Sequence, residues 1–383
     1  MSSTSAAPLS TSLPAPRYGA ATLTAAMVLA ISPLFSYAAP LDALLEAGAL
    51  PGSTDGSPRM QLRAGADRVN DQLDIFGLRS NDPRYAGTRI GDYGGAHLLG
   101  RIEHDRLRVD GQFWRRALQD RADTFHFRTW AIAGQLRLND AGAAHGLWAL
   151  RASAWGNQAD TIVRSTNTRL SVVGLDTQVT SVQLDGQYDR QRQLDLIFSQ
   201  RLGAHTVSAH AGVGSSRVGN SGVSGTSQIG NCAYALTFGS NNLTASPSGS
   251  CAGNAPSVRV PNNLLPYAAE PETNYGARFL QAGVSHRWQG EIWGTALGLN
   301  VEHWRRDRID DLIRQRKAIA YLNNLTAIGE LSARVTPGLG VILSGQVMQH
   351  QFVSELPLAY NTLSASRFGK VYGFATLGIN AEF

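Results

Sequence analysis

Charged residues in this sequence alternate with apolar ones instead of gathering in clusters. Arg101 and Glu103 are two residues apart, as are Arg108 and Asp110, and the residue between each pair is apolar. In an extended strand, side chains two residues apart lie on the same face. This spacing predicts charged faces that line a polar space. These faces could polarise that space, or they could form ion pairs that join the strands of its wall.

Eight charged residues fit this description, and we predict that they face the interior of one structure. They carry both signs, so the sequence leaves open whether they guide a solute or pair with one another across the wall. The predicted set is Arg101, Glu103, Arg108, Asp110, Asp185, Glu302, Glu330 and Arg334.

The two cysteines, Cys232 and Cys251, lie in one long stretch, 217–273, which is rich in Gly, Ser, Asn and Pro. A chain that is exported passes an oxidising compartment, where two nearby cysteines most simply form a disulfide. No histidine lies in this stretch to activate a catalytic thiol. We therefore predict a disulfide-bonded loop.

Catalytic and metal patterns are missing from the sequence. No G-x-S-x-G motif occurs, and the histidines show no spacing that pairs them with a serine or an aspartate. We predict a protein that is not an enzyme and that has no catalytic residues, no cofactor and no metal site.

Basic residues are spread along the chain and are almost all arginine. The formal net charge is +5, and lysine occurs only at Lys317 and Lys370. A nucleic-acid-binding protein gathers such charge into a patch, whereas here acidic residues accompany the arginines. We predict no nucleic-acid partner.

The elements that must carry the charged faces are strands of about ten residues. From residue 92 onward apolar side chains recur with a period of two, as in Leu98 and Ile102 or in Val109 and Phe113. Strands of this length and pattern are typical of transmembrane β-barrels, which use an even number of strands. We predict an all-β fold, an antiparallel up-and-down barrel of twelve strands over 85–383, with fourteen as the alternative if 73–78 or a split of 167–179 adds strands.

The N-terminal 84 residues divide into two predicted segments. Residues 1–38 contain Arg17, an apolar run and the small residues Ser36 and Ala38, which is typical of a secretory signal. Residues 39–84 begin with a short helical pattern at 41–50 and then turn polar and glycine-rich. We predict that this second segment is either a periplasmic leader or a plug in the lumen.

The C-terminus alternates to its last residue, with Leu377, Ile379 and Phe383 on one face and Tyr372 on the other. This ending resembles the last strand of bacterial outer-membrane β-barrels. The resemblance implies an outer-membrane location, lipid and the barrel assembly machinery as partners, and an assembly signal at Tyr372, Leu377, Ile379 and Phe383. Within that class the chain is similar to autotransporter barrels, although 39–84 leaves no room for a folded passenger.

The predicted function is a porin-like channel for ions or small polar solutes, with the stretch 217–273 over its mouth. An autotransporter-type translocator and a surface-binding barrel that acts through the disulfide loop remain as alternatives. The sequence does not distinguish among the three.

Overall fold

The computed structural model describes residues 45, 57–69, 90–120, 123–139, 146–172, 175–265, 272–350, 360–362, 365, 369 and 371–383. The predicted signal segment 1–38 and the possible strand at 73–78 lie outside these residues. Of the predicted helix at 41–50, only Leu45 is described, and it is helical.

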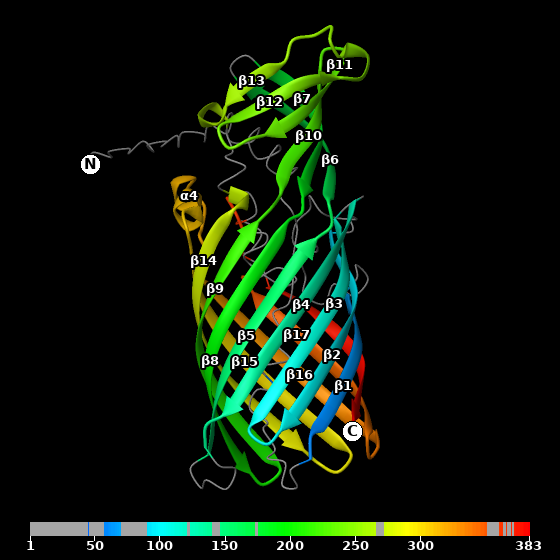
Figure 1. The fold of residues 1–383 in the computed structure, drawn as a ribbon, viewed down its shortest axis with the longest axis vertical. Helices are drawn as coiled ribbons and strands as arrows, with labels where there is room; N and C mark the ends of the chain where they lie inside the picture. Colours follow the sequence, from blue (N-terminus) through cyan, green and yellow to red (C-terminus); the bar gives the residue numbers. More distant parts are fainter. Residues whose placement is uncertain are drawn as a thin grey trace, which may run out of the picture.

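Twelve antiparallel strands form a closed barrel, which confirms the predicted fold class and strand number (Figure 1). In order around the ring they are β1 (Arg59–Val69), β2 (Ile90–His104), β3 (Leu107–Asp120), β4 (Asp123–Arg137), β5 (Leu147–Ala159), β8 (Tyr188–Leu202), β9 (His205–Gly219), β14 (Tyr275–Gln289), β15 (Trp293–Arg306), β16 (Asn323–Thr336), β17 (Leu339–Gln349) and β18 (Val371–Glu382).

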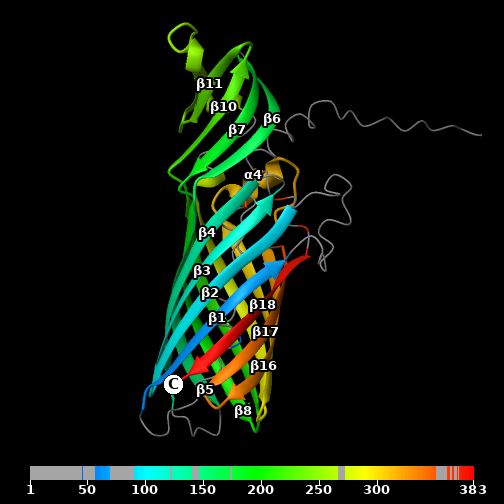
Figure 2. The same cartoon turned by 90° about the vertical axis from the view of Figure 1, so that its right-hand side faces the viewer.

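The barrel begins earlier than the sequence predicted. Strand β1 was expected to belong to a leader ahead of the barrel, yet it pairs with β2 on one side and β18 on the other. Figure 2 shows β1 (blue) beside β18 (red) along the wall. Backbone hydrogen bonds between Met60 and Phe383 extend this ladder to the last residue of the chain. The predicted boundary at residue 85 is therefore wrong.

The two faces of the barrel differ in chemistry. Large apolar side chains point outward and stay exposed, including Leu98 (49% exposed), Leu297 (62%) and Leu343 (52%). Polar and charged side chains alternate with them and point inward, among them Arg108 and Gln135. An apolar outside and a polar inside suit a barrel that sits in lipid.

A six-stranded sheet stands above one end of the barrel. Its order is β13-β12-β11-β10-β7-β6, and Figure 1 shows it as a separate lobe. Its strands are β6 (Ile162–Val172), β7 (Leu175–Asp185), β10 (Gly222–Ile229), β11 (Cys232–Phe238), β12 (Asn242–Ser248) and β13 (Val258–Pro261), with short 3-10 helices η3 (Gly249–Cys251) and η4 (Asn262–Leu264).

This lobe corrects two predictions. The stretch 217–273 is not a loop, because it holds four of the six strands; its predicted disulfide, Cys232–Cys251, is confirmed. Strands β6 and β7 were expected to cross the membrane. Instead, Val182 and Leu184 of β7 are buried inside the lobe, and Asp185 accepts hydrogen bonds from Thr161 and Gln183 there. Asp185 therefore does not face the barrel lumen.

The ends of the barrel differ in the length of their connections. Hairpins β2–β3, β8–β9 and β16–β17 turn through two residues at the end where the chain also terminates. The opposite end carries the lobe and the helix α4 (Ile309–Gln315). Because outer-membrane barrels have short periplasmic turns and longer extracellular loops, we assign the lobe to the extracellular end.

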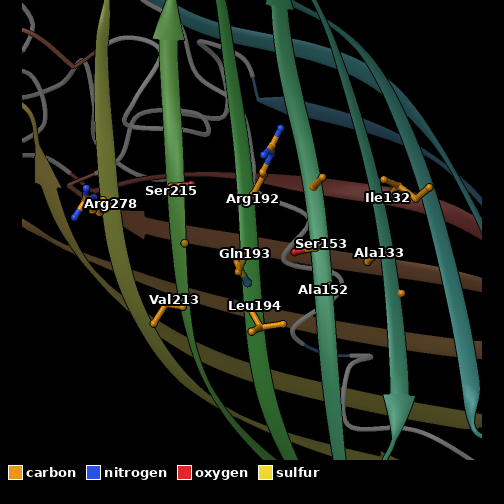
Figure 3. A pocket seen from close by; sticks show the side chains of 13 residues that line it. Ile132, Ala133, Ala152, Ser153, Arg192, Gln193, Leu194, Val213, Ser215 and Arg278 are labelled. Atoms are coloured by element: carbon orange, nitrogen blue, oxygen red, sulfur yellow. The ribbon is translucent and has the colours of Figure 1, made fainter.

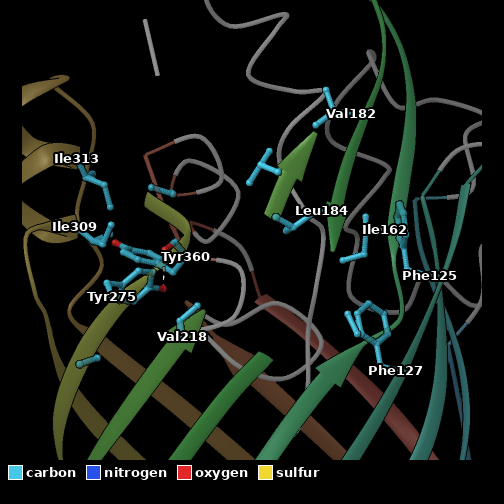
Figure 4. Close-up of a cluster of buried hydrophobic side chains, with 14 of the residues drawn as sticks. Phe125, Phe127, Ile162, Val182, Leu184, Val218, Tyr275, Ile309, Ile313 and Tyr360 are labelled. Carbon is cyan, nitrogen blue, oxygen red and sulfur yellow. Dashed lines mark hydrogen bonds between the residues drawn. The ribbon is translucent and has the colours of Figure 1, made fainter. Parts of the chain in front are cut away.

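An apolar cluster fills the junction between barrel and lobe. Figure 4 shows Phe127 and Val218 from the barrel strands near Ile162 and Leu184 of the lobe. Ile313 of α4 belongs to the same cluster and is fully buried. Within the described residues, no helix has both the length and the apolar composition needed to cross a membrane.

The outward face of β15 offers a test of membrane insertion. We expect Leu299→Arg to destabilise the folded barrel in lipid vesicles by about 2–4 kcal/mol, because the guanidinium would sit near the bilayer midplane. The matched variant His303→Arg lies on the same face nearer the strand end and should cost about 1 kcal/mol or less. Equilibrium denaturant titration of both variants measures the difference, and equal costs would contradict a lipid-facing Leu299.

The disulfide should stabilise the lobe without supporting the barrel. Cys232 and Cys251 are 19 residues apart, and in the chain-entropy model closing such a loop is worth about 3 kcal/mol. Replacing both by serine should make β10–β13 sensitive to an added protease, because the lobe opens more often. Heat-modifiable migration on a gel should show that the barrel is intact. Loss of the barrel together with the lobe would contradict this independence.

Candidate functional site in the barrel lumen

A buried carboxylate on β3 organises the largest ionic group of the inner wall. Asp110 Oδ1 accepts hydrogen bonds from Arg101 Nε at 2.7 Å and Arg108 Nε at 2.9 Å, and its Oδ2 accepts one from Arg151 Nη1 at 2.6 Å. Arg101 comes from β2 and Arg151 from β5, so the group joins strands on both sides of β3. The three arginines and Asp110 are all buried.

Neutral and acidic neighbours complete this group. Glu103 lies 3.9 Å from Arg101 Nε and 3.8 Å from Arg108 Nε. Gln61 of β1 accepts a hydrogen bond from Arg101 at 2.7 Å, and Gln135 of β4 accepts one from Arg151 at 3.3 Å. Three guanidinium groups therefore face two carboxylates, which leaves the group positively charged.

A second ion pair crosses from β1 to β16 near the periplasmic end. Arg63 Nη1 lies 3.1 Å from Glu330 Oε2, and both side chains are buried. A small cavity of about 90 Å³ opens beside them, lined also by Arg287 and Arg334. Arg334 is exposed at the rim, where the inward face of β16 meets solvent.

A third polar group surrounds Asp195 on β8. Gln281 donates to its carboxylate at 2.6 Å and Gln193 at 2.7 Å. The carboxylate lies directly over Gly212, where any Cβ would collide with it. His210 and Asn300 share a hydrogen bond of 3.2 Å nearby. Glycine at 212 thus makes room for a buried acid in the wall.

Paired side chains gather at the extracellular end of the barrel. Glu302 accepts a hydrogen bond from Trp304 Nε1 at 2.9 Å, and Arg306 Nη1 lies 3.0 Å from Asp310 Oδ1. The Arg306 guanidinium also lies 3.9 Å from the centre of the Tyr360 ring. A cation stacked on an aromatic face at this distance is favourable when shielded from water.

Glu272 binds Thr362 beside these paired side chains. Thr362 donates its backbone N–H to the carboxylate at 3.0 Å, and Arg316 Nη2 lies 2.9 Å away. Burial raises the pKa of Glu272, and the hydrogen bond from Thr362 and the charge of Arg316 offset only part of that rise. The carboxylate thus depends on these two partners to stay ionised.

An apolar contact to a residue outside the strands lies on the inner wall. Leu45 is helical and 2% exposed, and it packs with Ala296 of β15 and Ile328 of β16. In the β15–β16 register Ala296 is opposite Glu330 and Ile328 is opposite Gly298, and Ala296, Ile328 and Glu330 are buried on the face that points inward. A residue that precedes β1 in the chain therefore lies inside the barrel.

The structure places the eight predicted inward residues as follows. Arg101, Glu103, Arg108 and Asp110 come together in one group, Glu330 pairs with Arg63, Glu302 lies near the extracellular end, Arg334 lies at the periplasmic rim, and Asp185 lies in the lobe.

Several wall residues were missed, although the same signal was available. Arg151 and Asp195 alternate with outward Leu150 and Leu196 in the way that Asp110 alternates with Val109. Arg63 was missed because β1 was read as part of a leader. The periodicity that identified half of the wall could have identified these residues too.

The predicted assembly signal lies on the closing strand. Leu377 and Ile379 point outward and are exposed, and Phe383 is 78% exposed. Tyr372 belongs to β18, but its side chain is outside what the structure describes. In the described part of the chain, no three His, Cys, Asp or Glu residues gather closely enough to hold a metal ion.

The group around Asp110 predicts a large cost for losing its charge. Asp110→Asn would leave three buried guanidinium groups without their shared carboxylate, and we expect a loss of at least about 3 kcal/mol in barrel stability. Glu103→Gln should cost less, because Glu103 makes only the longer contacts with the same arginines. Denaturant titration in vesicles compares the two variants. If Asp110→Asn leaves barrel stability unchanged, the carboxylate does not hold the wall together.

Comparison with known proteins gives architectural likenesses at low identity. The sequence matches no protein-family model and no curated protein sequence. Similar solved structures include the translocator domain of autotransporter NalP from Neisseria meningitidis (11% identity, 90% of this chain and 95% of that one, TM-score 0.46). Others are the β domain of the Bordetella autotransporter BrkA (8%, 85% and 99%, 0.40) and the monoaromatic hydrocarbon channel CymD (8%, 86% and 89%, 0.38).

The assignment of this chain rests on its own geometry. The ring of twelve strands has no open edge, its outer face is apolar and exposed, and its interior is polar and charged. This chain is a β-barrel protein of the bacterial outer membrane.

Proposed function

We propose that this barrel is a gated channel for small polar solutes or ions, held closed by the segment that precedes β1. The role is transport and not catalysis. The observation that carries the proposal is the position of Leu45 inside the barrel, against Ala296 and Ile328.

The polar wall supports the transport part of this proposal. Guanidinium, carboxylate and amide groups from at least six strands face the lumen, including Arg101, Asp110, Gln135 and Asp195. Such groups can replace part of the water around a polar solute or an ion during passage. An apolar solute would gain nothing from them.

The burial of the same wall supports the closed state. Arg108 and Gln135 are 0% exposed and Asp110 is 2% exposed, although all three point into the lumen. In an open pore water would reach them. In this proposal the apolar cluster at the extracellular junction, which includes Phe127 and Val218, closes the other end of the path. Opening therefore requires a movement inside the barrel.

Single-channel recording tests the gate directly. We expect the wild-type barrel in a planar bilayer to show rare, brief current steps, and Leu45→Asp to show frequent or lasting ones. A carboxylate at position 45 would be buried against Ala296 and Ile328, which disfavours the docked segment. Deleting residues 39–56 should give the same open behaviour, since β1 begins at Arg59.

Leu264→Asp is the matched control, because Leu264 is exposed on the lobe and should not change the current. Folding of each variant is checked by heat-modifiable gel migration. If neither folded Leu45→Asp nor the folded deletion of residues 39–56 shows current steps, the channel is rejected. A wild-type barrel that is stably open would reject the plug.

A translocator is the second candidate, favoured by the same position of Leu45. In a translocator, a chain that crosses the barrel would place a residue ahead of the first strand against the inner wall, as Leu45 lies here. A small reporter placed after residue 38 would appear on the cell surface if the barrel translocates, and would stay inside if it is only a channel.

We also propose that the exposed end of β18 is the signal for the barrel assembly machinery. Leu377, Ile379 and Phe383 present an outward apolar face on the strand that closes the ring. Phe383→Ser should lower the amount of folded barrel in the outer membrane and leave the stability of the refolded protein nearly unchanged.

A further inference from the structure

Exposed arginines form a band on the outer wall at the extracellular ends of the strands. We call this set the arginine band. Its members are Arg68 on β1, Arg115 on β3, Arg128 on β4, Arg190 and Arg192 on β8, Arg217 on β9, Arg278 on β14 and Arg305 on β15.

Members of the band lie directly opposite one another on paired strands. The register places Arg190 against Arg217 and Arg278 against Arg305. Like charges in directly opposed positions destabilise a sheet unless a counterion lies between them. The band therefore favours an anion on the outer surface.

Among the described residues, acidic side chains do not neutralise this band. Arg128 pairs with Asp160 at 3.0 Å, where both side chains are more than half exposed. Arg192, Arg217 and Arg278 have no ion pair or side-chain hydrogen bond within the described residues. Asp307, in the turn after β15, is another acidic group at this rim. Within the part of the chain that the structure describes, these arginines thus keep most of their donors free.

An apolar groove lies directly below two of these arginines. It has a volume of about 660 Å³ and runs over β4, β5, β8 and β9. Its floor consists of small residues such as Gly134 and Ala152, and outward Ile132, Leu194 and Val213 flank it. Figure 3 shows Arg192, Ser215 and Arg278 on the extracellular side of Leu194 and Val213.

The register aligns three donors at the upper end of this groove. Ser215 is opposite Arg192 on β8 and opposite Arg278 on β14. One strand, β9, lies between the two arginines, and the two inter-strand spacings place their backbones about 10 Å apart. Guanidinium groups bind phosphate in a bidentate manner, and two of them can converge from this spacing with a hydroxyl between them.

We propose that this face binds a phosphate-bearing lipid of the outer leaflet. One acyl chain occupies the groove over Ala152, and the phosphate is held by Arg192, Ser215 and Arg278. The remaining arginines, such as Arg190 and Arg217, attract the headgroups of neighbouring lipids. The site favours a lipid over free phosphate, because the donors lie at the end of an apolar groove in the lipid-facing wall.

Native mass spectrometry of the full-length refolded barrel tests the proposal. The probes are a bis-phosphorylated, six-chain glucosamine disaccharide lipid and the same lipid without its phosphates. We expect the wild-type barrel to retain the phosphorylated lipid at least about tenfold better. Arg192→Gln/Arg278→Gln should remove this preference. Arg201→Gln should keep it, because Arg201 is an exposed arginine at the periplasmic end of the same strand.

A second variant keeps every charge and fills the groove. Ala152→Leu should lower retention of the phosphorylated lipid severalfold, whether or not the double arginine variant folds. Equal retention of the two lipids by the wild type would overturn the proposal. So would an unchanged preference in the folded double variant, unchanged retention in Ala152→Leu, or full displacement of the lipid by millimolar inorganic phosphate.

Discussion

The pairing of β1 with β18 is the interaction on which the rest of the structure depends. Without it, two strands would present unpaired backbone N–H and C=O groups to lipid, each at a cost of several kcal/mol. The ladder runs from Gln61–Glu382 to Arg68–Ala375 in one register. Because side chains alternate along a strand, this register also decides which residues face lipid and which face the lumen.

Closing the ring brings charge into the interior, and the interior satisfies it locally. Asp110 binds three arginines from neighbouring strands, and Glu330 binds Arg63 across the seam that the sequence did not reveal. These contacts bury the charged groups of the described wall. The gate that we propose would touch this wall at Leu45, which packs with Ala296 and Ile328.

Sequence periodicity predicted the barrel well and its boundaries less well. Strands β2 and β3 alternate large apolar residues with charged ones, and their orientations are as predicted. Strand β1 was missed because its outward positions include Ala64 and Ala66, and because Arg68 ends the pattern. Small residues give a strand no strong alternating signal.

The lobe shows a second limit of the same signal. A period of two reports a strand with one buried face, and it does not say whether lipid or protein covers that face. Val182 and Leu184 therefore looked like lipid-facing residues, although they pack inside the lobe. The polar run 190–193 belongs to β8, where Gln191 points inward and Arg190 and Arg192 point to the outer rim. The disulfide was predictable because the chain has only two cysteines.

Cross-linking across the seam tests the central claim, a barrel closed by β1 and β18. Ala66 and Leu377 are register partners and both face outward. Paired residues have Cα atoms about 4.5–5.5 Å apart, within the reach of a disulfide. In a Cys232→Ser/Cys251→Ser background, Ala66→Cys with Leu377→Cys should cross-link in the folded barrel, and Ala66→Cys with Val341→Cys, one strand further away, should not. Failure of the first pair to form in a folded barrel would contradict the closed ring that this account rests on.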